Sequence, residues 1–507
     1  MFTAQSPAKY SPEAFVGTSL DATAAGRETL FMHTPRRFLF VTLFLCMGVF
    51  AAEPKGKVFR AGAALSNITP PLGGAIIGGF LPFPATHVHD ELHARCLVLD
   101  DGSTRLAIVI CDLLGASREM FDAARQLVEK ETGIPGANVM LAGTHTHSAV
   151  SALSTERYVV GEALSDYQRF VVRRIADGIR CATNNLVPAQ VGWATASEPN
   201  HVFNRRWFMK PGTIPLSPLG EPDGVKMNPG RANENLVKPA GPTDPEIVLL
   251  SVRALDGRPI SVFANYSLHY VGGVGPGHVS ADYFAMFCDR MKELLVADRV
   301  DPPFVGLLSN GTSGNINNID FSKPGKTVPA YARMREVAND VAQAAFKAHQ
   351  TIRYHDWVSL GARLKELELG TRQPTDTQLA RAKGILSKPK PEGRSPNLEE
   401  IYAARTVSLA QQPKKLLVPI QVLRVGGMVI GALPGEVFVE TGLEFKEKSS
   451  LKPACIISVA NGYFGYLPTP EHLKLGGYET WLGTNRLETD AAPKMLATLF
   501  ALLAELK

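Results

Sequence analysis

The chain of 507 residues is 45% hydrophobic and 20% charged, a composition typical of a globular protein with a large core. The formal net charge of +5 is small for this length, and no long run of Lys or Arg occurs, so we expect no nucleic-acid partner. Length alone permits two or three domains and is equally consistent with one elaborated domain.

The N-terminal region has the features of a targeting segment. Arg36 and Arg37 precede the apolar run 38–50, and Val49 and Ala51 are small residues suitably placed before a cleavage site. This order predicts a secretory signal peptide, and the run is too short for a comfortable transmembrane helix. We expect residues 1–51 to be signal peptide and upstream extension, with Met32 as the alternative start. The mature chain is then secreted or periplasmic, without a transmembrane segment.

Strands and helices alternate along residues 53–507, which predicts an α/β fold with mixed β-sheets flanked by helices in a single large domain. In the first half we expect strands at 92–99, 105–111, 139–142 and 189–195, and helices at 117–132 and 164–184. In the second half we expect strands at 247–254, 260–265, 305–308, 417–425, 428–433 and 455–460, and helices at 282–295, 330–348 and 491–506.

Two stretches interrupt this alternation. Residues 200–243 are rich in Pro, Gly and Asn, and their charged and aromatic start favours an ordered lid or pocket wall over a disordered loop. Residues 370–415 are polar, with helical segments at 378–386 and 398–410, which indicates a surface insertion.

Two histidines follow the predicted strand 139–142, in the sequence Gly-Thr-His-Thr-His-Ser at 143–148. If the extended geometry continues, His145 and His147 point to the same side of the chain, at a strand end where open α/β sheets bind ligands. The pair could bind one metal, or one ring could bind metal while the other transfers protons. The alternative is a pair of hydrogen-bonded loop histidines.

Other strand ends carry further candidate ligands: Asp112, His269, Glu436 and Tyr466. Each has a structural alternative, namely a hydrogen-bonded histidine, a first-turn helix acid or a core aromatic. Two histidines and one carboxylate with an open position, however, are the ligand set of a catalytic zinc site. Asp112 could also orient a metal-binding histidine by hydrogen bonding to the ring nitrogen that does not bind the metal.

These motifs resemble those of the neutral/alkaline, non-lysosomal ceramidase family, from about residue 60 to residue 500. The matching segments are 141–148 (Leu-Ala-Gly-Thr-His-Thr-His-Ser), 263–269, 432–436 and 461–479. Members of this family are secreted or lumenal zinc amidases that cleave the N-acyl bond of ceramide into a fatty acid and sphingosine.

The resemblance implies a zinc-dependent hydrolase that cleaves an amide bond with metal-activated water. It implies Zn²⁺ as the cofactor and a small-molecule N-acyl substrate, lipid or polar. Its zinc ligands fall on His145, His269, Glu436 and Tyr466. The residues implied to orient the substrate, move protons and stabilise the oxyanion are His147, Arg205 and Tyr478.

Two departures from the family pattern concern the substrate more than the zinc. The family loop Gly-Asp-x-Ser-Pro-Asn, whose serine is catalytically important, corresponds here to residues 314–318, with Asn315 and Asn317 in place of the Asp and the Ser. Ser313 is a candidate substitute. The family's C-terminal β-sandwich is also not expected, since the chain ends after the last helix at Lys507. The Asn-rich loop favours a substrate more polar than ceramide.

Three alternatives stay open at this point. The first is a zinc esterase or deacylase acting on a polar acyl substrate. The second is a non-catalytic, metal-containing binding protein. The third is another metal-hydrolase scaffold, in which a second metal would use residues such as His201, His278, Asp282 and Asp112, or the stretch 87–93.

Overall fold

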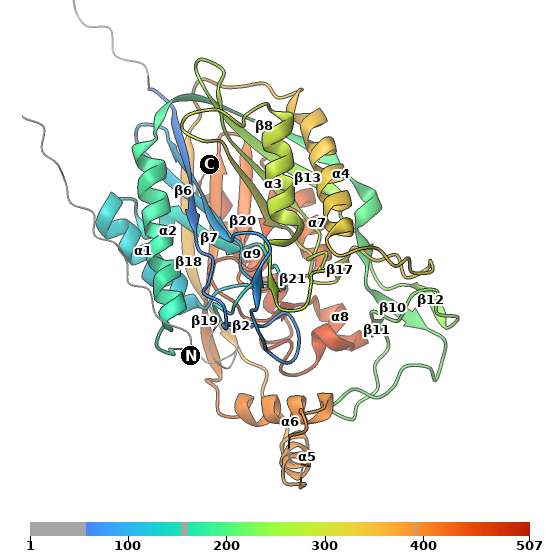
Figure 1. The fold of residues 1–507 in the computed structure, drawn as a ribbon. Helices are drawn as coiled ribbons and strands as arrows, with labels where there is room; N and C mark the ends of the chain where they lie inside the picture. Colours follow the sequence, from blue (N-terminus) through green and yellow to red (C-terminus); the bar gives the residue numbers. More distant parts are fainter. Residues whose placement is uncertain (1–56, 154–160, 390, 392, 507) are drawn as a thin grey trace, which may run out of the picture. The chain divides into compact units, whose positions relative to one another are not determined.

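Two large β-sheets, of eight and four strands, and their flanking helices form the framework of the described part of the protein (Figure 1). A computed structural model describes residues 57–153, 161–389, 391 and 393–506, all within one unit, Gly56–Lys507. The predicted signal peptide at 1–51 lies outside the described residues. Within them, no helix combines the length and the apolar character that a membrane span requires.

The larger sheet has the strand order β16-β14-β13-β8-β1-β5-β6-β7 among the described residues. Neighbours are antiparallel except for the parallel pairs β6–β7 and β14–β16. The strands are β1 (Arg60–Asn67), β5 (His93–Asp100), β6 (Arg105–Cys111), β7 (Val139–Gly143), β8 (Val187–Ser197), β13 (Glu246–Ala254), β14 (Pro259–Tyr266) and β16 (Val305–Asn310). The predicted strands in this part of the chain are confirmed, and β1 is added to them.

The smaller sheet has the order β18-β19-β20-β22, with β20 and β22 parallel. Its strands are β18 (Leu360–Gly370), β19 (Lys415–Val425), β20 (Met428–Ala432) and β22 (Ala454–Ile457). The sequence does not predict β18, because its Leu, Lys, Glu and Arg residues favour a helix. Pairing with β19 from Leu360↔Val425 to Gly370↔Lys415 overrides that preference.

The predicted helices are confirmed as α1 (Arg118–Thr132), α2 (Asp166–Asn184), α3 (Asp282–Leu294), α4 (Ala332–His349), α5 (Asp376–Leu386), α6 (Leu398–Leu409) and α9 (Ala491–Ala504). Local signals set several of their ends. The Ser117 hydroxyl accepts from the Met120 amide, and Gly133 ends α1 at a φ of 71°. The sequence misses two short helices, α7 (Val439–Lys448) and α8 (Pro470–Leu475).

The two sheets face each other across a shared apolar core, with helices on their outer faces. Ile108 of the larger sheet and Ile430 of the smaller one belong to this core. Helices α1 and α2 cover one half of the larger sheet and α3 and α4 the other half. Helices α7 and α9 pack on the smaller sheet. The layers are therefore helices, sheet, sheet and helices, which confirms the expected mixed sheets flanked by helices.

Residues between β18 and β19 leave the smaller sheet and return to it at a paired position, since Gly370 lies opposite Lys415. This excursion contains α5 and α6, which pack against each other.

The stretch 200–243 is ordered, with short strands β9 (Phe203–Asn204), β10 (Arg206–Met209), β11 (Lys226–Met227) and β12 (Leu236–Pro239). Other short strands are β2 (Ala75–Ile76), β3 (Phe83–Pro84), β4 (His87–Val88), β15 (His278–Val279), β17 (Ile316–Asn317), β21 (Glu436–Val437) and β23 (Tyr466–Leu467).

The sheets join through backbone hydrogen bonds at one end. The Gly143 amide donates to the Val459 carbonyl (3.3 Å), and the Ser458 amide donates to the Asn310 carbonyl (3.0 Å). The segments that follow β7, β14, β16 and β20 all start near this junction. Side chains from four distant parts of the sequence are thereby brought together.

Candidate metal centre

His145 lies just beyond the end of β7, in a backbone conformation unusual for a residue with a side chain. Its φ is 71°, so the extended geometry of β7 does not continue to His147. The expectation that both rings meet because the strand continues is therefore wrong. They meet because His145 turns the chain: its amide donates to the Leu113 carbonyl (2.9 Å), and its Nδ1 lies 2.7 Å from the Leu114 carbonyl. Such strain, about 1–3 kcal/mol, is frequent at functional sites.

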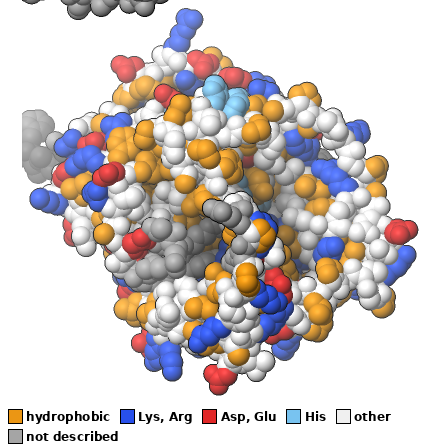
Figure 2. Space-filling model, turned by 60° about the horizontal axis from the view of Figure 1, so that its bottom comes forward, with side chains coloured by type: hydrophobic (Ala, Val, Ile, Leu, Met, Phe, Trp, Pro, Cys, Tyr) orange, Lys and Arg blue, Asp and Glu red, His pale blue; other side chains and the backbone are white. Residues whose placement is uncertain are grey.

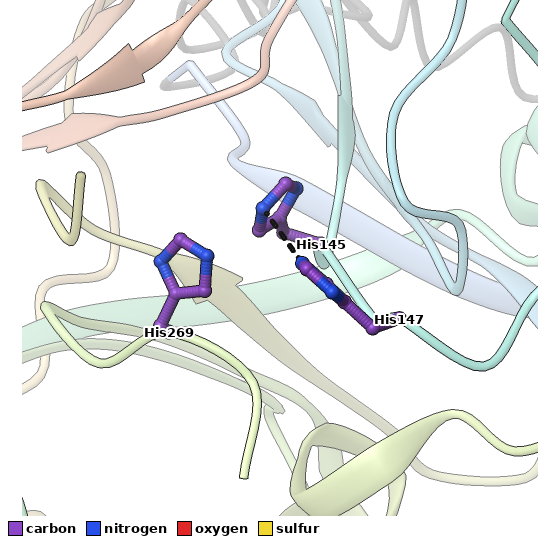
Figure 3. A group of neighbouring side chains, drawn as sticks. All are labelled: His145, His147 and His269. Carbon is purple, nitrogen blue, oxygen red and sulfur yellow. Dashed lines mark hydrogen bonds between the residues drawn. The ribbon is translucent and has the colours of Figure 1, made fainter. Parts of the chain in front are cut away.

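His145, His147 and His269 converge on one point (Figure 3). The Nε2 atoms of His145 and His147 are 3.3 Å apart. His269 follows β14, and its Nδ1 lies 3.0 Å from the Ser313 carbonyl, which leaves Nε2 to face the cluster. Carbonyl partners on Nδ1 fix the tautomer that presents Nε2 as a ligand.

Glu436 supplies a carboxylate to the same point from β21. Its Oε2 lies 3.3 Å from His145 Nε2 and 3.6 Å from His269 Nε2. Its other oxygen, Oε1, accepts a hydrogen bond from the Tyr463 hydroxyl at 2.6 Å. His145, His269 and Glu436 are buried. The sequence does not single out Tyr463, although it lies within the matching segment 461–479.

These donors fit a zinc ion. Four ligand atoms at about 2.0–2.1 Å from tetrahedral zinc lie about 3.3–3.4 Å from one another, close to the separations found here. His269 Nε2 and Glu436 Oε2 are buried and have no hydrogen-bond partner among the described residues, which is costly unless something else binds them. The histidine ligand atoms all lie within 4.8 Å of one another.

The electrostatics of the site suit a cation. Burial lowers the pKa of His147 and of His269 well below the ordinary range, and neighbouring positive charge lowers them further. Burial alone raises the pKa of Glu436, but the facing His145 and the Tyr463 hydroxyl hold it well below its usual value. The rings of His147 and His269 are therefore neutral and the Glu436 carboxyl is ionised, which are the forms that bind metal.

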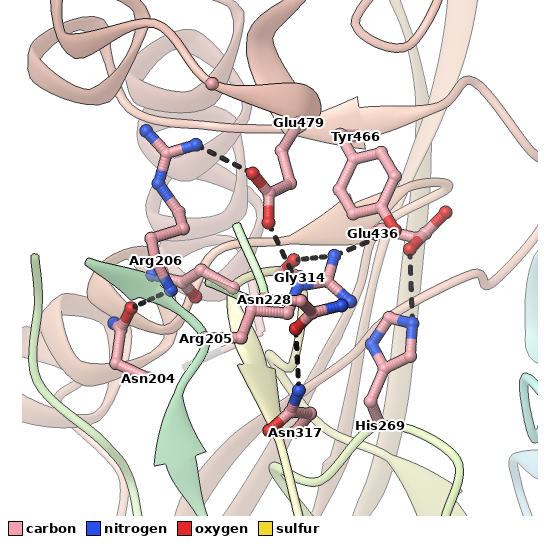
Figure 4. Close-up of polar contacts among 12 residues, drawn as sticks. Asn204, Arg205, Arg206, Asn228, His269, Gly314, Asn317, Glu436, Tyr466 and Glu479 are labelled. Carbon is pink, nitrogen blue, oxygen red and sulfur yellow. Dashed lines mark hydrogen bonds and ion pairs between the residues drawn. The ribbon is translucent and has the colours of Figure 1, made fainter. Parts of the chain in front are cut away.

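Arg205 binds Tyr466 beside this cluster (Figure 4). Its Nη2 donates to the Tyr466 hydroxyl oxygen at 2.9 Å and to the Gly314 carbonyl at 2.8 Å. Tyr466 lies beside Glu436, because β23 pairs with β21 at the register Glu436↔Tyr466. Burial raises the pKa of Tyr466 well above its ordinary value, so the phenol is protonated at neutral pH in the absence of a cation.

Glu479 holds Arg205 in place. Its Oε1 accepts from Arg205 Nε at 2.9 Å, and its Oε2 accepts from Arg206 Nη1 at 2.8 Å. The side chains of Arg206 and Glu479 are fully buried. The sequence assigns no role to Glu479, although it is the acid of the Tyr-Glu pair at 478–479, because nothing in the pattern connects it to the distant arginines.

Tyr478 lies one ring further from the histidines. Its ring centroid is 5.7 Å from that of Tyr466 and 5.8 Å from that of Phe80. The structure thus places Tyr478 next to Tyr466.

Solved structures share this fold, while no protein-family model matches the sequence. Neutral ceramidase from Pseudomonas aeruginosa matches 89% of the chain over 74% of its own length, with a TM-score of 0.66 and 17% identity. A ceramidase complexed with C2 matches 89% of the chain over 75% of its own length, with a TM-score of 0.65 and 16% identity. The chain has the fold of the neutral ceramidases. The resemblance drawn from the motifs is confirmed at the level of the fold.

The loop in which the sequence departs from the ceramidase pattern is buried beside this cluster. The Asn317 side chain donates a hydrogen bond to the Asn228 carboxamide oxygen (2.9 Å) and accepts one from the Ile319 backbone amide (2.9 Å). Ser313 donates to Asn310 Oδ1 at 2.7 Å and lies 3.3 Å from His269 Nδ1. It is therefore on the ring edge of His269 opposite to Nε2, away from the metal position, which argues against Ser313 as a substitute nucleophile.

Asn315 has a structural task in this loop. Its Oδ1 accepts from the Val439 amide at the start of α7, at 2.9 Å, and its Nδ2 donates to the Glu440 carboxylate at 3.0 Å. An aspartate here would face Glu440 with a second negative charge. The uncharged carboxamide of Asn315 is therefore compatible with the Glu440 carboxylate beside it.

The remaining candidate ligands have other partners. Asp112 pairs with Arg95 at 3.2 Å, so the expectation that it orients a histidine side chain is wrong. His201 pairs with an aspartate at 2.9 Å, His278 bonds a tyrosine hydroxyl, and Asp282 accepts from backbone amides. No second histidine- and acid-containing metal cluster is present among the described residues.

Proposed function

We propose that this chain is a zinc-dependent hydrolase that cleaves an amide bond, of the ceramidase type. The observation that carries the proposal is the convergence of His145, His269 and Glu436, with His269 Nε2 and Glu436 Oε2 buried and lacking hydrogen-bond partners among the described residues. The shared fold with neutral ceramidases supports amide cleavage as the reaction.

His145, His269 and Glu436 would hold the metal, with Tyr466 approaching from the side of β23. A zinc ion bound there would polarise the substrate carbonyl and lower the pKa of a water molecule to about 7. The protein contributes the position of these ligands and a buried environment.

His147 is the proposed proton carrier. Its ring stacks on Tyr270 at a centroid separation of 3.6 Å, which fixes its orientation beside His145. Because burial keeps the ring neutral, it can accept a proton from the attacking water and pass it to the leaving amine.

Arg205 and Tyr478 are the proposed stabilisers of the negative charge that develops on the carbonyl oxygen. Arg205 is buried and positioned by Glu479, so its charge is already oriented before reaction. Asn317 occupies the position of the family serine. Because a carboxamide is not a nucleophile, we propose that it shapes the site through its hydrogen bonds with Asn228 and Ile319.

Metal analysis combined with turnover tests this function. The purified mature chain is assayed against a panel of N-acyl amides and matched esters before and after chelation, and its zinc content is measured in parallel. We expect about one zinc per chain, amide turnover lost on chelation, and recovery with zinc. Active protein without stoichiometric zinc would contradict the proposal.

A second candidate is a metal-containing binding protein without catalysis, which the replacement of the family serine by Asn317 favours. Full zinc occupancy without turnover across the panel would support it, and faster cleavage of esters than of amides would identify an esterase. We further propose that the chain is secreted or periplasmic; the N-terminal residue of the mature protein, determined by mass spectrometry, tests this.

A further inference from the structure

The two carboxylate oxygens of Glu436 have different surroundings. Oε1 accepts a hydrogen bond from the Tyr463 hydroxyl at 2.6 Å. Oε2 lies 3.3 Å from His145 Nε2 and has no hydrogen-bond partner among the described residues. A carboxylate can bind a metal ion through one oxygen or through both. Because Tyr463 engages Oε1, only Oε2 is available at the point where the histidines converge.

Packing fixes the position of the Tyr463 ring. The ring forms a small hydrophobic cluster with Leu114, Leu153 and Val459. A Cβ on Gly115 would lie 3.3 Å from the ring, so the backbone also closes against it. Tyr463 is the most exposed of the four at 9%, so the cluster lies inside the protein and is not part of a surface such as that in Figure 2, where hydrophobic side chains lie among charged ones. A ring packed in this way keeps its hydroxyl in one place.

The same small cluster also supports His145. The backbone carbonyl of Leu114 lies 2.7 Å from His145 Nδ1 and so orients that ring. The backbone carbonyl of Val459 accepts from the Gly143 amide at 3.3 Å, two residues before His145. Residues whose side chains pack on the Tyr463 ring therefore also hold, through their backbone, the segment that carries a second candidate ligand.

Backbone hydrogen bonds hold Tyr463 and Glu436 next to each other. The Phe464 amide donates to the Pro434 carbonyl at 2.8 Å, and the Glu436 amide donates to the Gly465 carbonyl at 3.0 Å. The residues that follow Tyr463 therefore run alongside the residues that lead into Glu436. Because both the backbone and the ring of Tyr463 are fixed, its hydroxyl meets the carboxylate at a set position.

We propose that Tyr463 is a positioning residue of the candidate metal centre: its hydroxyl holds Glu436 Oε1, so that Oε2 alone is presented to the metal. This inference rests on the proposed function, since it requires the metal. A catalytic zinc site keeps one position open beside its protein ligands, and a carboxylate that bound through both oxygens would fill that position. Tyr463 thereby keeps room for the substrate.

The first experiment compares zinc affinities by titrating metal-free protein with zinc in the presence of a competing chelator. Tyr463→Phe removes the hydroxyl and keeps the ring in its cluster. Loss of a group that hydrogen-bonds a metal ligand usually lowers metal affinity by about 10–100-fold, and we expect a fall of this size. Tyr167→Phe is the matched control, because it removes a hydroxyl on α2 that donates to the Ile68 carbonyl at 2.8 Å. It should bind zinc as the wild type does.

A spectroscopic experiment distinguishes positioning from a general loss of stability. Co²⁺ bound in place of zinc absorbs visible light strongly at a tetrahedral site and weakly when more ligands bind it. Tyr463→Phe releases Oε1, which can then join Oε2 on the metal, so we expect weaker visible absorption in this variant and no change in Tyr167→Phe. Zinc affinity that does not fall in Tyr463→Phe, or a wild-type cobalt spectrum, would overturn the proposal. A lower Tm as the only effect would show a purely structural role and would also overturn it.

These measurements also separate this inference from the proposed function. Wild-type protein that binds no zinc would reject the candidate metal centre and, with it, the role of Tyr463. Zinc bound equally tightly by the wild type and by Tyr463→Phe would reject only the role of Tyr463. The expected loss of affinity and change of spectrum, in a protein that hydrolyses no amide, would support the role of Tyr463 and reject the hydrolase.

Discussion

Glu436 brings a negative charge into a buried group of imidazoles. Burial alone would raise the pKa of this carboxyl, yet the facing ring and the Tyr463 hydroxyl lower it. A carboxylate kept ionised in the interior needs a compensating cation or strong hydrogen bonds. The arrangement therefore supports the proposed metal between Glu436, His145 and His269.

Replacing this charge tests the ligand assignment. Glu436→Gln keeps the shape of the side chain but removes the anionic ligand. Losing a residue that only hydrogen-bonds a metal ligand lowers metal affinity by up to about 100-fold, so losing the ligand itself should lower zinc affinity by more than that. Titration of zinc into metal-free protein measures it. Glu444→Gln, an exposed glutamate paired with Lys448 on α7, is the control and should bind zinc normally. Unchanged affinity in Glu436→Gln would remove Glu436 from the ligand set.

The protonation of Tyr466 leads to a prediction about how zinc affinity depends on pH. Its pKa is raised well above the ordinary value by burial, so the metal-free phenol is protonated at neutral pH. If Tyr466 binds zinc as a phenolate, one proton leaves on binding, and affinity rises with pH. The slope of log affinity against pH should then be steeper by about one in the wild type than in Tyr466→Phe. Equal slopes would show that the phenolate is not a ligand.

Glu479 is the shared counter-charge of two buried arginines. Glu479→Gln leaves Arg205 and Arg206 without it, and breaking a buried pair usually costs about 3–5 kcal/mol. Urea unfolding measures this loss. We also expect a lower kcat, because Arg205 loses its fixed position against Tyr466. Glu505→Gln, which breaks the exposed Arg363 pair, should change stability by less than about 1 kcal/mol.

At the scale of elements, the segments that follow β7, β14, β16 and β20 build the site, and helix α7 anchors one of them. Asn315, in the segment after β16, caps α7 through the Val439 amide and pairs with Glu440 on its first turn. The helix and the loop thereby fix each other, which positions Gly314, whose carbonyl binds Arg205.

Asn315→Asp tests this coupling. The new carboxylate would face Glu440 at about hydrogen-bond distance, and like charges so placed should destabilise the protein by about 2–4 kcal/mol. The loss should diminish in the double variant Asn315→Asp/Glu440→Gln, where the repulsion is absent. A double-mutant cycle of unfolding free energies gives the coupling. Additive effects would show that the two side chains do not interact in solution.

At the scale of the whole molecule, the centre joins segments from both sheets. A metal bound by His145, His269 and Glu436 would link β7, β14 and β21, and it would bind only the folded state. Such a ligand stabilises by about 4 kcal/mol when present at about 1,000 times its Kd. Chelation should lower Tm by several degrees, and zinc should restore it. Calorimetry on the mature chain measures this, and an unchanged Tm with zinc removed would contradict a metal that links these strands.

The sequence by itself predicted the alternation of strands and helices and where most of them begin and end. Helix-capping residues are strong local signals: Ser117 caps the start of α1 and Gly133 ends it. It also placed six candidate ligands after strands, of which the resemblance selected four as zinc ligands: His145, His269, Glu436 and Tyr466. It missed β18, where pairing with β19 overrides local preference, and α7, whose start is capped by Asn315 from a distant loop.

Only the tertiary structure decided how these residues work together. His145 faces His147 because of a left-handed backbone turn, which no side-chain pattern encodes. Glu479 meets Arg205 and Arg206, and Asp112 meets Arg95, because sheet pairing and burial bring charges together that are distant in the sequence. Local propensity acts over a few residues, whereas these contacts are set by packing across the whole fold.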